Sequence, residues 1–321
     1  MLMHSRTYEK YVDDWLRQAC PIFYFHSKEE FFPIAVSDII NHSHLWQHGT
    51  ELFGTHALEK RFEIMSTIQQ YDSNVYLDIQ PHIFNGYLPK TYHHQVTQPM
   101  VTERQLQDAP IYTHCRPVNT DTWTEEEVEL DLVYYIAYSN NGPQLRCWCV
   151  QTCGHKSDWE CVIVRIKGNV RTGVAIFSRI YYNCHNQYDG QWVSSFEMKN
   201  NRPVVYTALY SHANYPSKGH WWWLFGALHD PCDEGHLWEP QLLIRLNEQN
   251  TPWIQYASGW TEELTCPLIQ YNSLYRNLHH TTTDYSNPWY RRLLYPCLKL
   301  HTWSFMQSIT AWIRPFKKIS Y

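Results

Sequence analysis

The chain has 321 residues, which allows one large domain or two small ones. Hydrophobic residues make up 44% and charged residues 18%, which excludes a disordered polymer, and the 12 glycines are too few for a collagen-like chain. The net charge of −5 argues against nucleic-acid binding by the whole surface, so no nucleic-acid partner is expected. The aromatic content of 16% favours strands, sugar-stacking surfaces or interfaces over a helical bundle.

No signal peptide is predicted at the beginning of the chain, because Glu9, Asp13 and Asp14 fall where an apolar core would lie. No stretch approaches the roughly 18 uncharged apolar residues of a membrane span, so no transmembrane segment is predicted. These features predict a cytoplasmic or peripheral membrane protein. They are also compatible with signal-independent secretion.

The chain has ten cysteines, of which Cys147, Cys149 and Cys153 lie close together. Their spacing differs from the paired C-x2-C of structural zinc sites. Because Trp148 alternates with its neighbours, Cys147 and Cys149 are predicted on one face of a strand. Buried free thiols are the favoured interpretation, with a disulfide and a metal site as alternatives.

The first third of the chain combines helical and extended patterns. Residues 8–20 place apolar side chains at helical spacing, and Pro21 ends the run. Residues 22–36 are predicted to be extended, with a helix beginning near Ser37. The polar, histidine-rich stretch 41–70 contains a second predicted helix around 57–68.

A series of strand-like runs with short turns and no interposed helical pattern follows. Neighbouring strands without crossover helices pair through hairpins or Greek keys, so we predict a mainly β protein. The expected architecture is an antiparallel β-sandwich with short flanking helices. The predicted strands are 74–79, 109–118, 128–138, 144–151, 159–166, 173–182, 191–198, 203–213 and 241–246.

The composition changes near residue 263, which divides the chain into a sandwich domain, 1–262, and an aromatic, basic C-terminal helical extension, 263–321. Residues 285–321 contain lysines and arginines but no acid, interspersed with Trp, Phe, Leu and Ile. A basic helix with such an apolar face can lie in a lipid interface. The favoured interpretation is a helix docked on the sandwich with its basic side in water.

The sharpest local feature is the segment Gly154-His155-Lys156-Ser157-Asp158-Trp159-Glu160, which leads into an apolar strand. Strand alternation places Asp158 and Glu160 on one face and Trp159 on the other. Two carboxylates on an otherwise apolar face are unfavourable unless they are paired, protonated or bound to a metal. With His155 as a third ligand, the pattern indicates a divalent cation such as Mg²⁺, Ca²⁺ or Mn²⁺.

A second feature is the run 203–213, which ends in the turn SHANYP. If its strand neighbours the first one, His212 reaches Asp158 and Glu160. Three consecutive indoles at 221–223 cannot all point into one core, so at least one is expected at the surface or an interface. It would form a binding rim or pack beneath the C-terminal extension. The ligand-binding candidates are His212, Ser211, Tyr215, Asn141, Trp159 and Trp222.

From about Pro21 to Trp260 the sequence resembles the vacuolar protein sorting-associated protein 62 family. The resemblance is carried by the order and spacing of several segments, and it implies a link to protein delivery rather than a known reaction. These segments are FHSKEEFFP (25–33), YLDI (76–79) with Asn85-Gly86, IYTHCRP (111–117), DLVYYIAYSNNGP (131–143), HKSDWECVIVRI (155–166), GQWV (190–193), RPVVYTALYSHANYPSKG (202–219), Asp233-Glu234-Gly235 with Trp238, and SGW (258–260).

The segment 154–160 is also similar to the Gly-His-Arg-His-Asp-Trp-Glu segment of the necrosis- and ethylene-inducing peptide-like proteins. In those proteins it sits at a divalent metal beneath a membrane-glycolipid-binding loop on a β-sandwich. This likeness implies His155, Asp158 and Glu160 as metal ligands. Lys156 and Ser157 replace Arg and His of that segment, so its second histidine is missing.

Together these features predict a non-enzymatic, divalent-cation-supported binding module for a membrane surface or a lipid or glycan headgroup, acting in protein trafficking or as an effector. One alternative is a metal-dependent hydrolase, in which Asp158 and Glu160 hold the ion that activates water and His155 or His212 moves the proton. Against it, the sequence has no nucleophile elbow, phosphate loop or His-Glu-x-x-His helix. The other alternative is a structural interaction protein without a ligand site.

Overall fold

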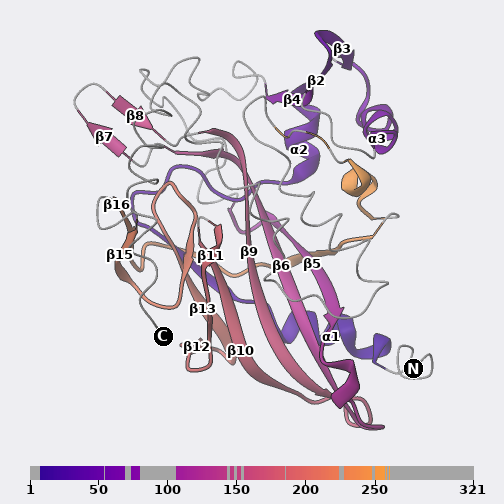
Figure 1. Ribbon diagram of the computed structural model, residues 1–321, viewed down its shortest axis with the longest axis vertical. Helices are drawn as coiled ribbons and strands as arrows, with labels where there is room; N and C mark the ends of the chain where they lie inside the picture. The colour runs from indigo at the N-terminus through magenta and orange to yellow at the C-terminus, as the bar shows by residue number, and fades with distance from the viewer. Residues whose placement is uncertain are drawn as a thin grey trace, which may run out of the picture.

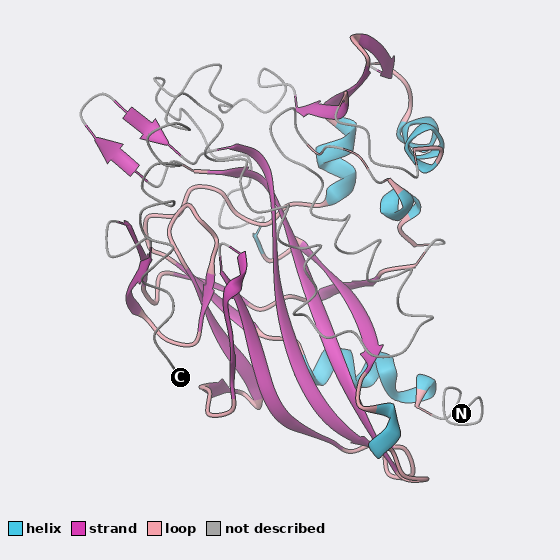
Figure 2. Ribbon diagram, in the orientation of Figure 1, coloured by secondary structure: helices cyan, strands magenta, loops and turns pink. Residues whose placement is uncertain are grey.

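The computed structural model shows a mainly β chain with several sheets and few short helices (Figure 1 and Figure 2). The predicted C-terminal extension, 263–321, lies outside the described residues. No helix in the described part is long and apolar enough to cross a membrane. The structure describes residues 8–53, 55–68, 74–79, 106–142, 145–147, 150–152, 155–184, 186–223, 228–247, 250–256, 258 and 260.

The first helix, α1 (Glu9–Ala19), confirms the predicted helical spacing, because Val12, Trp15, Leu16 and Ala19 are all buried. Its indole at Trp15 donates a hydrogen bond of 2.6 Å to the carbonyl oxygen of Gly173. The same ring lies so close to Gly168 that a Cβ on that residue would be 2.6 Å from it. The helix is therefore fixed against the far end of the main sheet.

The main sheet has six strands and is built around the two longest strands of the chain. β6 (Glu127–Asn141) and β9 (His155–Asn169) pair antiparallel along their full length, from Glu127↔Asn169 to Asn141↔His155. The strand order is β11 (Asn186–Val193), β10 (Ala175–Cys184), β9, β6, β5 (Pro110–Pro117) and β18 (Leu242–Arg245).

A second sheet shares the apolar core of the first. The ring of Phe25 packs against Tyr138 of β6 at 6.3 Å, and the Tyr182 hydroxyl of β10 donates to the carbonyl oxygen of Val204 at 3.2 Å. The second sheet has the order β12 (Met198–Lys199), β13 (Arg202–Thr207), β1 (Ile22–Phe25) and β17 (His236–Trp238), with β14 (Asn214–Tyr215) paired to β13.

Two strand pairs correct the expectation of a purely antiparallel arrangement. β1 pairs with β13 in parallel, and β18 pairs with β5 in parallel. The strands of each pair lie far apart in the sequence, so no hairpin turn dictates their relative direction. Tertiary contacts between distant segments set their direction instead, and that information is not local.

Three predicted strand runs are divided or shortened in the structure. The run 144–151 contains two antiparallel strands, β7 (Leu145–Cys147) and β8 (Val150–Thr152). Cys149 lies outside the described residues, so its predicted placement on one strand face with Cys147 stays a prediction. The run 191–198 is divided between β11 and β12. In the run 203–213 the strand ends at Thr207, and a turn follows it. In this turn Tyr210 and His212 have φ of 65° and 55°.

The remaining elements are small. The helices predicted near Ser37 and around 57–68 are present as α2 (Val36–Asn41) and α3 (Leu58–Ser66). Between them lies a hairpin that was not predicted, formed by β2 (Ser43–Gln47) and β3 (Thr50–Phe53). The five cysteines described with their side chains, at positions 20, 115, 161, 184 and 232, are free thiols. The side chains of Cys147, Cys149 and Cys153, for which buried thiols are predicted, lie outside the described part. The elements are α2 (Val36–Asn41), β2 (Ser43–Gln47), β3 (Thr50–Phe53), α3 (Leu58–Ser66), β4 (Val75–Ile79), η3 (Thr120–Thr122), β15 (Gly219–Trp223), β16 (Leu228–Cys232) and η5 (Pro252–Gln255).

Candidate functional site

The site lies where β6 ends and β9 begins, facing the turn that follows β13. The register of these strands pairs Tyr138 with Asp158 and Ile136 with Glu160. Strand alternation sends Trp159 to the opposite face, as predicted, where its ring contacts Trp260 at 5.4 Å. Asp158 and Glu160 therefore share one face and Trp159 belongs to the apolar core.

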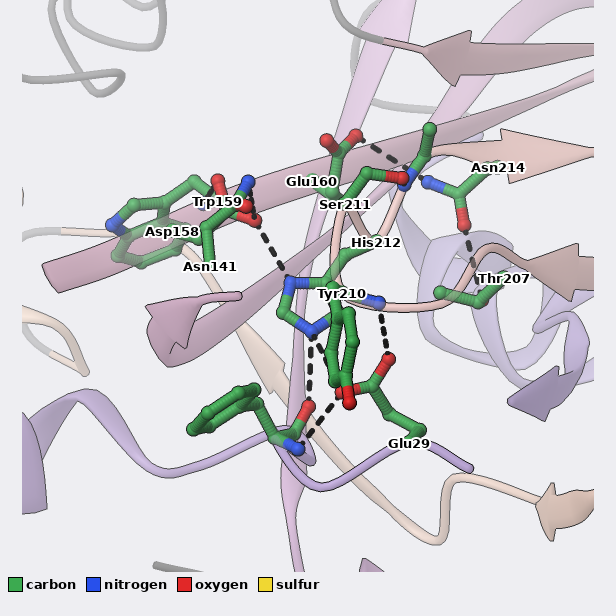
Figure 3. Close-up of polar contacts among 12 residues, drawn as sticks. Glu29, Asn141, Asp158, Trp159, Glu160, Thr207, Tyr210, Ser211, His212 and Asn214 are labelled. Carbon is green, nitrogen blue, oxygen red and sulfur yellow. Dashed lines mark hydrogen bonds and ion pairs between the residues drawn. The ribbon is translucent and has the colours of Figure 1, made fainter. Parts of the chain in front are cut away.

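His212 occupies the centre of the site and is fully buried (Figure 3). Its Nδ1 lies 2.9 Å from a carboxylate oxygen of Asp158, and its Nε2 lies 3.0 Å from the carbonyl oxygen of Phe31. The imidazole is stacked on the Tyr138 ring at 3.8 Å, with the two planes within 3°. The expected approach of His212 to Asp158 is thus present, although it is made from a turn rather than from a strand.

The charge of His212 follows from these contacts. Both ring nitrogens face acceptors, so both must donate, which requires the protonated imidazolium. Burial by itself lowers the pKa of His212, but hydrogen bonds to Asp158 and Glu29 outweigh it and raise the pKa to about 10. The ring is therefore a fixed buried cation at neutral pH.

Glu29 is the second anion beside this cation. One of its oxygens lies 3.7 Å from His212 Nε2 and accepts hydrogen bonds from the backbone N–H groups of Glu30 and Phe31, both at 2.9 Å. Its other oxygen accepts the N–H of Tyr210 at 2.7 Å. Burial alone raises the pKa of Glu29, but His212 and these donors lower it overall. Glu29 therefore joins the segment after β1 to the turn after β13.

The carboxylate of Asp158 contacts both His212 and the side-chain amide of Asn141. Its Oδ1 accepts the backbone N–H of Trp159 at 2.9 Å, and its Oδ2 lies 3.4 Å from Asn141 Nδ2. The Asn141 side chain is buried, and its Oδ1 has no hydrogen-bond partner in the part of the chain that the structure describes. A buried, unsatisfied amide oxygen is unfavourable by about 1–3 kcal/mol. A cation bound beside Asp158 would satisfy this oxygen.

Glu160 is the carboxyl group with the weakest compensation. Asn183 Nδ2 lies 2.7 Å from Glu160 Oε2, and Asn214 Nδ2 lies 3.5 Å from the same oxygen. Burial first, and then the charges of Asp158 and Asp230, raise the pKa of Glu160 well above its ordinary value. Amides donate hydrogen bonds but bring no charge, so they do not offset the raised pKa, which favours the protonated form of Glu160.

Ser211 and Tyr215 meet at a neighbouring buried carboxylate. Their hydroxyl groups donate to the two oxygens of Asp230, at 2.9 Å and 2.7 Å respectively. The Tyr215 ring stacks on Trp221 of β15 at 4.7 Å, which connects the site to the β15–β16 hairpin. Trp222, the next residue of β15, is 64% exposed. This confirms that at least one of the three consecutive indoles lies at the surface.

The predicted ligand set of His155, Asp158 and Glu160 remains a prediction. His155 begins β9 opposite Asn141, but its side chain lies outside the described part. Among the side chains that the structure describes, no three His, Cys, Asp or Glu residues form a metal-binding group. Residues that sequence reasoning did not assign to the site are Glu29, Tyr138, Asn183, Asn214 and Asp230. Glu29 lies within the segment FHSKEEFFP, but nothing local distinguishes it from Glu30.

The model of one protein family, vacuolar protein sorting-associated protein 62, matches residues 2–227. The chain belongs to this family. The match contains His212, Asp158, Glu160 and Glu29, and it confirms the resemblance for the segments up to residue 219. Asp230 and the segments at 233–238 and 258–260 lie beyond it. No match was found among curated proteins or among solved structures.

Proposed function

We propose that this member of the vacuolar protein sorting-associated protein 62 family is a non-enzymatic binding module. In it, a divalent cation, Mg²⁺ or Ca²⁺ with Mn²⁺ as a further option, supports recognition of a membrane surface or a lipid or glycan headgroup. The observation that carries the proposal is a charge imbalance. Glu29, Asp158 and Glu160 are 5%, 9% and 7% exposed, yet the only ion pairs formed with them by described residues come from His212.

A bound cation would displace the proton of Glu160 and supply the ion-pair partner that no described residue gives this carboxyl group. Buried carboxylates are tolerated when they are paired or coordinate a metal. Glu160 has one oxygen engaged by amides, and Asn141 offers a buried carbonyl oxygen without a partner. Carboxylate and amide oxygens are the ligands that Mg²⁺ and Ca²⁺ prefer. Asp158, Glu160 and Asn141 would therefore hold the ion, with His155 as the further ligand predicted from sequence.

The surface beside this cluster suits a headgroup at an interface. The Trp221 ring covers Tyr215, and Trp222 is exposed on the same strand. Indoles combine an apolar body with a polar N–H group, which favours the boundary between lipid and water. The common core of the two larger sheets supports a β-sandwich as the framework. We accordingly propose a peripheral membrane location linked to trafficking or to an effector role.

The hydrolase alternative is weakened by His212. A general base must accept a proton, but both nitrogens of this imidazole face acceptors and the pKa is raised to about 10. The imidazole is also fully buried, so it cannot contact a substrate directly. Only His155 would then remain of the two histidines proposed to move the proton.

The structural alternative is favoured by one specific observation. The Glu29–His212–Asp158 network connects three segments that are distant in sequence, and it does so through protein groups only. If this network is the whole role of the cluster, the protein will bind no cation there. The following experiment therefore separates the two proposals.

Calorimetric titration of the chelator-treated full chain with Ca²⁺ or Mg²⁺ tests the cation. We expect about one ion per chain and about one proton released per ion, because Glu160 must lose its proton to become a ligand. Repeating the titration in two buffers of different ionisation enthalpy measures the protons released. Glu160→Gln and Asp158→Asn should lose the site, whereas the exposed control Glu125→Gln should retain it. An unchanged titration in both site variants would exclude the ion from this cluster.

Vesicle co-sedimentation tests the ligand. Full-length protein should pellet with phosphatidylserine-containing or glycolipid-containing vesicles in Ca²⁺ and remain soluble in chelator. Glu160→Gln and Trp222→Ala should each reduce the pelleted fraction several-fold. An ion bound without any effect on vesicle binding would leave a structural ion site and refute headgroup recognition.

A further inference from the structure

The hairpin formed by β15 and β16 presents two imidazoles and an indole on its outer face. The register pairs Trp221 with Asp230 and Trp222 with His229. Trp221 and Asp230 point inward, where both contact Tyr215. Strand alternation then places His220, Trp222 and His229 on the opposite, outward face. Both histidines are exposed.

The two histidines are diagonal neighbours across the hairpin. His220 is opposite Pro231, two residues along the strand from His229. Their ring centres are 5.0 Å apart, and the ring planes are inclined by 44°. Diagonal cross-strand pairs are normally separated by roughly 7–8 Å between their Cα atoms, so the two imidazoles lean toward each other.

This separation matches two ligands of one tetrahedral ion. A zinc–nitrogen bond of about 2.0–2.1 Å and a distance of about 1.2 Å from nitrogen to ring centre place each centre about 3.2 Å from the metal. At a tetrahedral angle of about 109°, the two centres would then be about 5 Å apart. The observed distance of 5.0 Å between the two ring centres matches this spacing.

We propose that His220 and His229 form a site for a divalent transition-metal ion of the zinc type. Imidazole nitrogen is a preferred ligand for Zn²⁺, Cu²⁺ and Ni²⁺ and a poor one for Mg²⁺ and Ca²⁺. Two protein ligands leave the other coordination positions to water or to a ligand brought by a partner. The site is therefore chemically distinct from the oxygen-rich cluster around Asp158 and Glu160.

The bound ion would cross-link the two strands of the hairpin that carries the exposed indole of Trp222. The Trp222 ring lies 4.8 Å from the His229 ring, with the planes inclined by 34°. Joining His220 to His229 restrains both strands and with them the outward position of Trp222. The same proximity supplies a reporter, because Cu²⁺ bound to His229 quenches the fluorescence of an adjacent indole.

Zinc titration of the full chain, with excess Mg²⁺ present to occupy any oxygen-rich site, tests this proposal. We expect His220→Gln and His229→Gln each to lose one zinc equivalent, or to bind it at least tenfold more weakly. His56→Gln, an exposed histidine on another part of the chain, should bind as the wild type does. Wild-type zinc binding in both hairpin variants would overturn the proposal.

Copper quenching gives an independent readout. The quenched component should be present in the wild type and in His56→Gln, and absent in Trp222→Phe, His220→Gln and His229→Gln. Quenching that persists in both histidine variants would also overturn the site. Because these measurements do not involve Glu160 or vesicles, their outcome is separate from that of the proposed function.

Discussion

Replacement of His212 by Asn is the sharpest test of the buried network. Asn is chosen because it tolerates the left-handed backbone, and His212 has a φ of 55°. The substitution removes the cation between Asp158 and Glu29 and the ring stacked on Tyr138. It leaves two buried carboxylates without a counter-charge.

Two arguments give the same magnitude for the stability lost in His212→Asn. The pKa of His212 rises from 6.5 to about 10, and this shift corresponds to roughly 5 kcal/mol of preference for the protonated folded form. Removing one partner of a buried ion pair costs about 3–5 kcal/mol. We therefore expect the free energy of unfolding of His212→Asn to fall by about 3–5 kcal/mol near neutral pH.

The effect should depend on pH in a defined direction. The folded pKa lies above the unfolded value, so the contribution of His212 is complete below pH 6.5 and is lost as pH rises through about 10. The difference between wild type and His212→Asn should thus be largest at acidic to neutral pH and shrink toward pH 10.

Urea unfolding followed by circular dichroism, at several values between about pH 6 and pH 10, measures both quantities. His56→Asn, at an exposed histidine, is the matched control and should change stability by less than about 0.5 kcal/mol. A loss below about 1 kcal/mol in His212→Asn at acidic pH would refute the assignment of a buried imidazolium. So would a loss of the expected size that does not vary with pH.

Three further predictions concern other contacts. Gly168→Ala should lower the free energy of unfolding by about 1–3 kcal/mol, measured by urea unfolding, because the new Cβ would lie 2.6 Å from the buried Trp15 ring. Asp131→Asn should lower it by about 3–5 kcal/mol, because it leaves the guanidinium of Arg165, bonded to Asp131 at 2.6 Å, without its buried partner; a loss under about 1 kcal/mol would contradict this. Glu160→Gln should raise the melting temperature in chelator, increasingly so as pH rises above 4.5, because the raised pKa of Glu160 makes the wild-type folded state lose stability there; a melting temperature below the wild-type value would contradict it.

The periodic elements were predictable because their signals are local. Apolar spacing in α1 identifies the buried face of that helix, and alternation along β9 separates Asp158 and Glu160 from Trp159. Likewise, three consecutive indoles cannot all point into one core, so at least one of them is expected at the surface. Trp222 is 64% exposed. These conclusions use only the repeat of a helix or strand and the volume of a side chain.

The interior polar contacts were not predictable in the same way. Asp131 stands between Leu130 and Leu132 in an apolar strand, which signals a buried charge, but nothing local identifies Arg116 and Arg165 as its partners. One hydrogen-bond donor to Glu29, the backbone N–H of Tyr210, also comes from a turn 181 residues further along the chain. Such pairs depend on how distant strands align.

The amino-acid sequence by itself determined that the chain is mainly β, that it belongs to its family, and that two acidic side chains share a strand face. The tertiary structure alone decided that β1 runs parallel to β13 and that His212 is held between Asp158 and Glu29. The reason is physical. A strand repeat is encoded in neighbouring residues, whereas the direction of a strand partner and the counter-charge of a buried group are set by burial summed over the whole fold.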